Sequence, residues 1–358
     1  MERVSKYKNV LIARFSALGD VAMTVPVVYS VCAAYPGTRF VMITQQVASS
    51  LFINAPSNLV VIGVDVKMKY RGVKGMCKLF RELRREYSID LFIDLHDVIR
   101  TYAIEACCFV SGVPFRRIRK GRRDKKRLTR SHGKQLRKLV SSHERYADVF
   151  SRAGFEFPES FVSLFSGPAG FSAFAEITPP KQEGEKWIAI APFAKHQGKI
   201  YPVDRMENVV AALAARDDTK IFLFGGGGSE RETLHAWVER YGDNVVSIAE
   251  KRYGFPKELA LLSHMDVMVS MDSANMHLAS LVCLPVVSVW GATHPYCGFT
   301  GWKQLECDIV QSELQCRPCS VFGNSPCRRG DYACFAAITP EMVIEKIDRV
   351  LSRIKSNK

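Results

Sequence analysis

The sequence predicts an α/β protein built from two doubly wound parallel sheets. Short apolar segments alternate with amphipathic helical patterns through most of the chain, and this alternation favours parallel strands connected by helices. A stretch rich in glycine and proline interrupts the alternation near its middle. The length of 358 residues also fits two domains, because one domain commonly contains about 100–200 residues.

The first half contains the elements of one doubly wound domain, assigned to residues 1–165. Its strands are expected at Lys8–Phe15, Arg39–Thr44, Leu59–Val64 and Ile89–Asp94, and its helices at Val21–Ala34, Val73–Glu86 and Ser141–Ala153. Residues 166–186 are expected to form a linker, since they combine several glycines and prolines.

The alternation restarts in residues 187–337, which we assign to a second doubly wound domain. Strands are expected at Trp187–Ala191, Lys220–Phe224, Asn244–Ile248, Val267–Ser270 and Pro285–Trp290, and helices at Val203–Ala214, Glu230–Arg240, Pro256–Leu262 and after Asp272. Residues 338–358 contain a final amphipathic helix at Pro340–Ile354. We expect this helix to pack back on the N-terminal domain.

Ligands in such sheets bind beyond the carboxyl ends of the strands, so the motifs that follow strands carry most information. The first strand runs into Ser16-Ala17-Leu18-Gly19-Asp20, a glycine turn that exposes backbone N–H groups and places Asp20 at a helix entrance. A carboxylate there either caps the helix or serves as a general base. We expect Gly19 to be among the residues that bind a diphosphate. The G-x-G-x-x-G fingerprint of dinucleotide-binding proteins is absent from this turn.

Two loops of the second half contain residue types that suit a phosphate. One holds Lys195 and Lys199 after a strand, and a lysine supplies a mobile positive charge to phosphate oxygens. The other is the run Gly225–Gly228, whose glycines Gly226 and Gly227 allow a ligand to approach the backbone closely. The alternatives are an exposed loop lysine and a tight strand-to-helix turn.

A third segment, Met271 to Ala279, leads from a strand into a helix. The unpaired N–H groups at a helix N-terminus bind anions, and a diphosphate fits there. The residues concerned are Asp272, Ser273, Ala274, Asn275 and His277. Asp272 or Ser273 could instead only cap the helix, and His277 could be a core histidine.

The net charge of +14 is concentrated in one segment, Arg116 to Lys138, which has thirteen Lys or Arg and one acid, Asp124. Such a block attracts a polyanion, either nucleic acid, anionic lipid or a phosphorylated glycan. A solvated basic loop is the alternative. The residues with which we expect an acceptor or membrane to interact are Arg116, Arg117, Arg119, Lys120, Arg122 and Arg123.

Four cysteines, Cys316, Cys319, Cys327 and Cys334, lie within nineteen residues near the C-terminus. Their spacing permits a small structural zinc site, and free thiols or a disulfide are the alternatives. No apolar stretch is long enough for a transmembrane helix or a signal-peptide core, so we expect a cytoplasmic protein.

These motifs, in this order, resemble glycosyltransferase family 9, the bacterial heptosyltransferases of the lipopolysaccharide inner core. Residues 272–279 and 284–295 are similar to the family's Asp-Thr-Gly, His-Leu-Ala and Pro-x5-Gly-x-Thr elements, with Ala274 in place of the glycine. Ser16–Asp20 resembles its Gly-Asp turn. Lys199-Ile200-Tyr201-Pro202 resembles its Lys-x-Trp-Pro element, with Tyr201 in place of the tryptophan.

The resemblance implies a GT-B fold, in which two Rossmann-like domains, an acceptor-binding one and a nucleotide-sugar-binding one, face a central cleft. It also implies inverting transfer, with Asp20 as general base and Lys199 stabilising the leaving diphosphate. Family members often meet the nucleotide ribose with an acidic residue, for which Glu230 is the candidate. No Asp-x-Asp metal motif appears, so we expect transfer without a metal or other cofactor.

By resemblance the donor is ADP-heptose and the acceptor is the anionic lipid-A core, reached by an enzyme peripheral to the inner membrane. Another nucleotide sugar or surface-glycan acceptor is the nearer alternative. A nucleic-acid-binding protein that uses the basic block is the alternative from another class. We expect no nucleic-acid partner, because the block lacks the interleaved aromatic residues on which bases stack.

Overall fold

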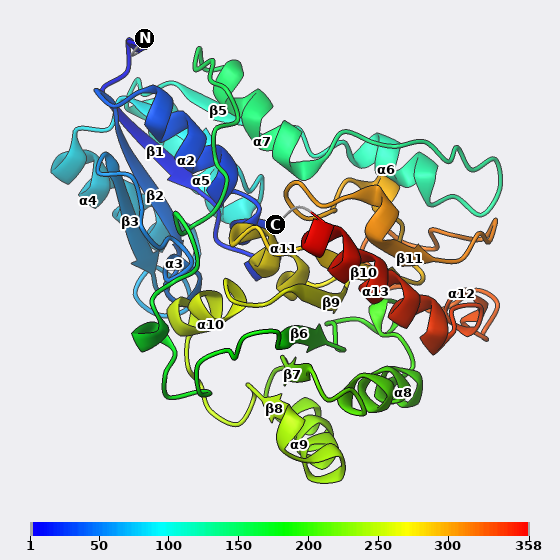
Figure 1. The fold of residues 1–358 in the computed structure, drawn as a ribbon. Coiled ribbons are helices and arrows are strands. Elements are labelled where there is room, and N and C mark those ends of the chain that lie inside the picture. The colour runs from blue at the N-terminus through cyan, green and yellow to red at the C-terminus, as the bar shows by residue number, and fades with distance from the viewer. Residues whose placement is uncertain (1–2, 357–358) are drawn as a thin grey trace. The chain divides into compact units, whose positions relative to one another are not determined.

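The computed structural model describes residues 3–356, whose contacts divide the chain into two compact units (Figure 1). Unit 1 comprises the residues up to 121 together with 140–162, and unit 2 comprises 122–139 together with the residues from 163 onward. Each unit contains a parallel sheet, as the alternation of strand and helix patterns predicted.

The sheet of unit 1 has the strand order β3-β2-β1-β4-β5. Its strands are β1 (Asn9–Ala13), β2 (Arg39–Gln45), β3 (Leu59–Val64), β4 (Leu91–Asp94) and β5 (Phe115–Arg117). Its helices are α1 (Leu18–Ala22), α2 (Val25–Ala34), α3 (Gln46–Ser49), α4 (Gly72–Tyr87), α5 (Ile99–Val110) and α7 (Ser142–Ser151). The central strand β1 pairs with β2 on one side and β4 on the other, with Leu11 opposite Val41 and Phe92.

Residues far apart in the sequence form the core of unit 1. Apolar residues of α4, among them Met76 and Phe80, join Ile104 of α5 and the strand residues Leu11 and Val41 in one buried cluster. Burial of both sheet faces explains why these strands are continuous apolar runs rather than alternating ones.

Unit 1 departs from the expected elements in a divided helix and in three elements that were not predicted. The helix predicted at Val21–Ala34 is divided into α1 and α2, and Pro26 lies in the first turn of α2, where its missing N–H is tolerated. Strand β5 and helices α3 and α5 were not predicted, and α3 has only four residues. Strand β5 has only three residues, two of them arginines, and the last turn of α5 exposes Phe109 and Val110, which blurs its apolar stripe.

The sheet of unit 2 has the strand order β11-β10-β9-β6-β7-β8. Its strands are β6 (Lys186–Ala191), β7 (Thr219–Leu223), β8 (Val245–Ser247), β9 (Val267–Met271), β10 (Val286–Trp290) and β11 (Ile309–Gln311). Its α-helices are α6 (Arg122–Leu128), α8 (Val203–Ala214), α9 (Ser229–Tyr241), α10 (Phe255–Leu262), α11 (Ala274–Leu281), α12 (Ala333–Ala336) and α13 (Pro340–Ser356). Short 3-10 helices are η1 (Phe171–Ala173), η2 (Gln197–Lys199), η3 (Gly242–Asn244), η4 (Pro295–Cys297) and η5 (Glu306–Asp308).

The C-terminal helix α13 packs within unit 2, so the expectation that it packs on the N-terminal domain is wrong. Its apolar face buries Val343, Ile347 and Val350 in the same cluster as Val209 of α8 and Val289 of β10. An amphipathic pattern shows which face of a helix is buried, but it carries no information about which sheet receives that face.

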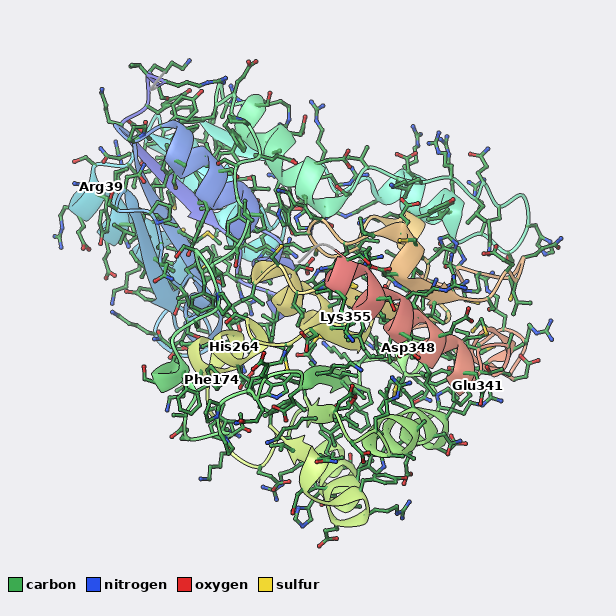
Figure 2. The ribbon with its side chains drawn as sticks, in the orientation of Figure 1. Arg39, Phe174, His264, Glu341, Asp348 and Lys355 are labelled. Carbon is green, nitrogen blue, oxygen red and sulfur yellow. The ribbon has the colours of Figure 1, made fainter. Side chains whose placement is uncertain are left out.

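The predicted linker is a packed part of unit 2 rather than a bare connection. Phe174 is buried, with its ring centroid 4.7 Å from that of His264 and 6.3 Å from that of Trp187 (Figure 2). Lys181 Nζ also lies 2.5 Å from Asp266 Oδ2. Glycine and proline mark irregular backbone, yet the aromatic side chain between them anchors this segment.

The basic segment is divided between the units, which differs from the expected boundary at residue 165. Residues 116–121 belong to unit 1, whereas 122–139 belong to unit 2. Within unit 2, Leu139 N–H donates to the Tyr296 carbonyl at 3.0 Å, and Lys138 Nζ lies 2.5 Å from Glu306 Oε1. These partners lie more than 150 residues away in the sequence, so local composition could not reveal the division.

Candidate active site

The anion-binding segment of unit 2 has the predicted strand-to-helix form. Strand β9 ends at Met271, Asp272 follows, and α11 begins at Ala274. Ser273, the residue before α11, has extended backbone, and its side chain makes no capping hydrogen bond. Its hydroxyl instead lies 3.3 Å from that of Ser270. Helix capping by Ser273 is therefore not what the structure contains, and the first-turn N–H groups of α11 remain available to an anion.

Lys199 and Asp272 come together at the carboxyl edge of the unit 2 sheet. Lys199 ends η2, which follows β6, and its Nζ lies 2.9 Å from Asp272 Oδ2. Both side chains are largely buried, with 14% and 4% of their surfaces exposed. A pair so shielded from water interacts more strongly than a surface pair, and it places a cation beside the start of α11.

The loop that carries Lys199 rests on two other segments of unit 2. Gly198 accepts a hydrogen bond at 2.9 Å from the Ala292 N–H in the turn after β10. The stem of Lys199 passes over Gly323, where a Cβ atom would lie 2.6 Å from Lys199 Cγ. Tyr201, two residues after Lys199, also anchors this loop. Its side chain is buried, and its hydroxyl donates to the Ile338 carbonyl at 2.9 Å.

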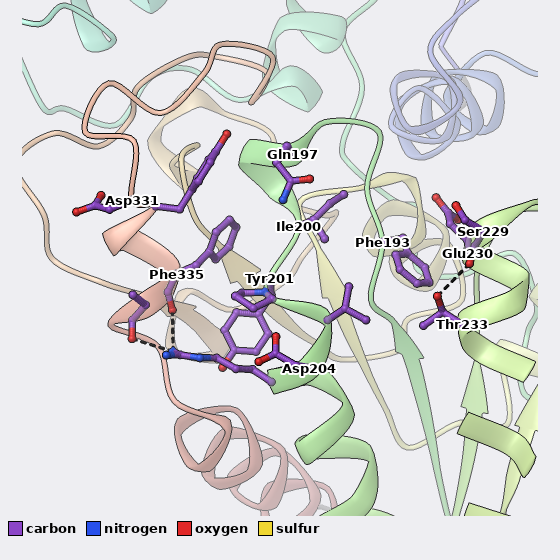
Figure 3. A pocket seen from close by; sticks show the side chains of 15 residues that line it. Phe193, Gln197, Ile200, Tyr201, Asp204, Ser229, Glu230, Thr233, Asp331 and Phe335 are labelled. Atoms are coloured by element: carbon purple, nitrogen blue, oxygen red, sulfur yellow. Dashed lines mark hydrogen bonds between the residues drawn. The ribbon is translucent and has the colours of Figure 1, made fainter. Parts of the chain in front are cut away.

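The glycine run lies at the same edge, between β7 and α9. Gly226 N–H donates to Glu230 Oε2 at 2.6 Å, so the carboxylate folds back over the start of α9. Glu230 also lines a cavity of about 700 Å³ (Figure 3). Other residues that line it are Phe193, Gln197 and Ile200 from the segment between β6 and α8, and Thr233 from the first turns of α9.

The remaining predicted residues of unit 2 occupy different environments. Ala274, Asn275 and His277 lie in the first turns of α11, with His277 buried and the other two partly exposed. Gly227 is exposed in the glycine run. Lys195 is exposed in the loop before η2, so Lys199 is the lysine that the fold brings to Asp272.

In unit 1, residues in the turn after β1 hold the Asp20 side chain. Asp20 Oδ2 accepts the Ala17 N–H at 3.1 Å and lies 2.5 Å from Nη2 of Arg14. Gly19 precedes it in α1. Asp20 thus caps the helix, as one interpretation held, but 29% of its side chain remains exposed. Capping does not exclude reactivity, because a carboxylate accepts several hydrogen bonds.

Three residues at this edge of unit 1 were missed by the sequence analysis: Arg14, Asp94 and His96. Arg14 is buried and donates to the Leu95 carbonyl at 2.8 Å. Burial raises the pKa of Asp94 to about 6 and lowers the pKa of His96 to about 3, and the charge of Arg14 adds to the effect on His96. Their signal was positional, since Arg14 follows β1 and His96 follows β4, where functional residues gather.

The predicted basic residues are held in different ways. Arg117 pairs with the buried Glu105 and lies over the Tyr102 ring, while Lys120 Nζ donates to the Asp97 carbonyl at 3.1 Å. Arg116 donates to the Arg152 carbonyl at 3.0 Å. The other predicted basic residues, Arg119 in unit 1 and Arg122 and Arg123 in unit 2, are exposed. Within residues 3–356, no helix is long and apolar enough to cross a membrane.

The four C-terminal cysteines are free thiols, and among the described residues no group of three or more His, Cys, Asp or Glu is arranged to hold a metal. This arrangement corresponds to the free-thiol alternative, and the zinc site that the spacing permits stays a prediction. Cys334 packs in the hydrophobic core of unit 2, and Cys319 Sγ is directed to the Cys316 carbonyl at 3.4 Å. The spacing brought the thiols into one loop region, but tertiary packing turned them to different partners.

Two doubly wound parallel units in one chain define the GT-B fold, which is shared by solved structures of similar topology. A glycosyl transferase family 9 protein from Veillonella parvula has a TM-score of 0.76 at 16% identity, over 99% of this chain and 100% of that one. The E. coli heptosyltransferase WaaC, solved with ADP, has a TM-score of 0.66 at 19% identity, over 96% and 99% of the two chains.

The sequence comparisons identify the family. The family model described as glycosyltransferase family 9 (heptosyltransferase) matches residues 76–326, well over half of the chain. The chain therefore belongs to glycosyltransferase family 9, and it is a glycosyltransferase. A curated relative, lipooligosaccharide heptosyltransferase 2 of Campylobacter jejuni, is 21% identical over 339 residues, which cover 93% of this chain and 96% of the relative.

Proposed function

We propose that this enzyme transfers heptose from ADP-heptose to the inner core of lipopolysaccharide, with inversion at the anomeric carbon. The observation that carries the proposal is the buried Lys199–Asp272 pair beside the start of α11, in a chain of family 9. Curated relatives named as lipopolysaccharide heptosyltransferases of E. coli and Pseudomonas aeruginosa support heptose as the sugar and lipopolysaccharide as the acceptor. The E. coli heptosyltransferase WaaC, solved with ADP-2-deoxy-2-fluoro heptose, supports an ADP-linked donor.

The donor diphosphate binds, in this proposal, at the first-turn N–H groups of α11 and at Lys199. Negative charge grows on the diphosphate as the bond to the sugar breaks, and a lysine and a helix N-terminus both stabilise it. Asp272 holds Lys199 in place before the donor binds. Glu230, beside the glycine run, accepts hydrogen bonds from the ribose hydroxyls.

Asp20 is the proposed general base. It takes the proton from an acceptor hydroxyl while that oxygen attacks the anomeric carbon, and the carbon–oxygen bond to the diphosphate breaks on the opposite face. A base must be ionised to accept a proton, and the guanidinium of Arg14 at 2.5 Å stabilises negative charge on Asp20.

An Asp20→Asn variant tests the base assignment. Asparagine retains the side-chain oxygen that caps α1 but cannot take the proton, so we expect kcat to fall by about 10²–10⁴-fold. ADP affinity should remain unchanged, because the proposed diphosphate site consists of unit 2 residues. Turnover near that of the parent enzyme would refute the role of Asp20.

We also propose that transfer requires no metal, since Lys199 and α11 supply the positive charge that a divalent ion provides in other transferases. Transfer should therefore continue in EDTA. Loss of turnover in EDTA that is restored by magnesium or manganese would overturn this statement.

The choice of ADP-heptose is tested with a panel of ADP-, GDP- and UDP-sugars, assayed for thermal stabilisation and for transfer. We expect stabilisation by ADP-heptose and transfer from it to a lipid-A-core acceptor. Transfer from a UDP- or GDP-sugar alone would retain the family and reject the donor.

The acceptor is anionic and membrane-embedded in this proposal, and the enzyme is a cytoplasmic protein peripheral to the inner membrane. The basic residues Arg116 to Lys138 supply the attraction, at about 1 kcal/mol for each Lys or Arg near the surface. A variant with Arg119, Arg122 and Arg123 changed to Gln should bind anionic vesicles more weakly and neutral vesicles equally. Unchanged binding to anionic vesicles would remove this segment from the proposal.

A further inference from the structure

Arg317 is a buried cation whose partners are almost all backbone carbonyl groups. Only 2% of its surface is exposed, and burial lowers its pKa. It donates to the carbonyl oxygens of Trp290 at 3.0 Å, Gly291 at 2.5 Å and Thr293 at 3.0 Å, to the Ser312 carbonyl, and to Gln311 Oε1 at 3.2 Å. Burial of a cation is costly unless its donors are satisfied, so these hydrogen bonds hold both Arg317 and the backbone around it.

Three of these carbonyls belong to residues 290–293, a turn that begins at Trp290, the last residue of β10. The same turn donates from Ala292 N–H to the Gly198 carbonyl at 2.9 Å, immediately before Lys199. Its Ala292 carbonyl accepts the N–H of Cys319 at 2.8 Å, two residues beyond Arg317. A continuous set of hydrogen bonds thus leads from the guanidinium to the backbone of Lys199.

The segment that contains Arg317 also supports the Lys199 side chain. Gly323 lies directly against its stem. On the other side, Lys134 Nζ donates to the carbonyls of Cys316 at 2.6 Å and Pro318 at 3.1 Å, which fixes the backbone on both sides of Arg317. A lysine has a flexible four-carbon stem, so a rigid backbone support reduces the ordering cost when it meets an anion.

We propose that Arg317 is a positioning residue for the transfer reaction, which holds the turn 290–293 and thereby places Lys199 for the leaving diphosphate. Arg317 acts through Lys199 and does not contact the donor. The inference rests on the role proposed above for Lys199.

A double-mutant cycle between Lys199 and Arg317 tests this inference. The probes are ADP, GDP and UDP, which share the diphosphate. Their affinities are measured by calorimetry for the parent enzyme, for Lys199→Met, for Arg317→Met and for the double variant. We expect each single variant to bind the preferred nucleotide about tenfold more weakly, and the double variant to bind no more weakly than Lys199→Met. Such non-additivity is the result expected when one residue acts through the other.

Arg353→Met is the matched control. Arg353 pairs with the buried Asp308, so loss of the Arg353 side chain should destabilise unit 2. The hydrogen bonds described above for the turn 290–293 do not involve this pair. It should lower the melting temperature and leave nucleotide affinity unchanged. If Arg317→Met does not fold, Arg317→Lys replaces it, because lysine keeps the charge but cannot reach all the carbonyls.

The outcomes distinguish the proposed diphosphate site from the positioning role of Arg317. Unchanged affinity in Lys199→Met would reject the proposed diphosphate site itself. A weakened Lys199→Met with parental affinity in the Arg317 variant, or with additive losses in the double variant, would reject only the positioning role. An equal affinity loss in Arg353→Met would also reject it, because general destabilisation would then explain the effect.

Discussion

At the residue scale, the site of unit 2 depends on the placement of one lysine. Lys199 and Lys195 are four residues apart and chemically identical, yet only Lys199 meets Asp272, at 2.9 Å. The difference arises from backbone contacts, because Gly198 bonds to Ala292 and the Lys199 stem lies over Gly323. A charge becomes a binding group when its surroundings fix its position.

A methyl group at position 323 tests this packing. Gly323 has a φ of +70°, and its Cβ would lie 2.6 Å from Lys199 Cγ, so Gly323→Ala strains the backbone and displaces the lysine. Gly330→Ala is the control, because φ there is +79° and no heavy atom lies within 4 Å of the added Cβ. We expect both variants to lose about 1–2 kcal/mol of unfolding free energy. Only Gly323→Ala should weaken ADP binding, as measured by calorimetry; equal affinities would contradict the packing argument.

At the element scale, helix ends have different chemistry in the two units. Helix α11 begins without a side-chain cap, which suits an anion site. Helix α7 begins with a full capping box, in which Ser141 Oγ accepts the Glu144 N–H at 3.1 Å and Glu144 Oε2 accepts the Ser141 N–H at 2.6 Å. The start of α11 is the proposed diphosphate site, whereas the cap of α7 contributes to the stability of unit 1.

Removal of the α7 cap should therefore affect stability alone. Ser141→Ala leaves the Glu144 N–H without its acceptor, and we expect a loss of about 1 kcal/mol in unit 1. Ser151→Ala, at the exposed end of the same helix, should cost nothing because alanine is the better helix former. Hydrogen exchange of the α7 amides measures both. Equal protection in the two variants would argue against a capping role for Ser141.

The packing of α13 on unit 2 gives a second prediction at this scale. Ile347 is fully buried in the core of unit 2, so Ile347→Ala should cost about 2–5 kcal/mol. Met342 is 39% exposed on the same helix, and Met342→Ala should cost much less. The four tryptophans, Trp187, Trp237, Trp290 and Trp302, all lie in unit 2, so their fluorescence during urea unfolding reports this unit. An unchanged fluorescence midpoint in Ile347→Ala would contradict the packing.

At the scale of the whole molecule, each unit buries a neutral histidine near its site. His96 in unit 1 and His294 in unit 2 both have lowered pKa values, mainly because burial disfavours the charged ring. For His294, the charges of Arg317 and Lys134 add to this effect and lower its pKa to about 4. Arg317 and Lys134, which support the Lys199 loop, therefore contribute to the acid sensitivity of unit 2 stability.

Unit 2 should become less stable as the pH falls, because of His294. Between pH 6.5 and about 4, the unfolded chain binds a proton at His294 that the folded chain does not bind. The contribution of neutral His294 to the free energy of unfolding is therefore fully present above pH 6.5 and is lost as the pH falls toward 4. Urea unfolding followed by tryptophan fluorescence should show a lower midpoint at pH 5 than at pH 7.5. The His294→Gln variant should show a smaller difference, and an equal difference would exclude His294 as the source.

Much of the fold and part of the site could be predicted from the sequence because their signals are local. Continuous apolar runs such as Trp187–Ala191 predict buried parallel strands. Gly19-Asp20 and Asp272-Ser273 follow strands, where ligands bind in such sheets. The alternation of elements also gave two parallel sheets. No comparable signal marked Arg317, which lies between cysteines and meets carbonyls as many as 27 residues away.

The sequence by itself determined the two doubly wound sheets and the chemical groups at their strand ends. Hydrophobic periodicity and strand-end motifs both depend only on residues that are close together in the sequence. Only the tertiary structure decided that α13 packs on unit 2, that the basic segment is divided at residue 121, and that Lys199 rather than Lys195 meets Asp272. The physical reason is the same in each case. Burial and hydrogen bonding depend on partners that are distant in the chain, and only the folded backbone brings those partners together.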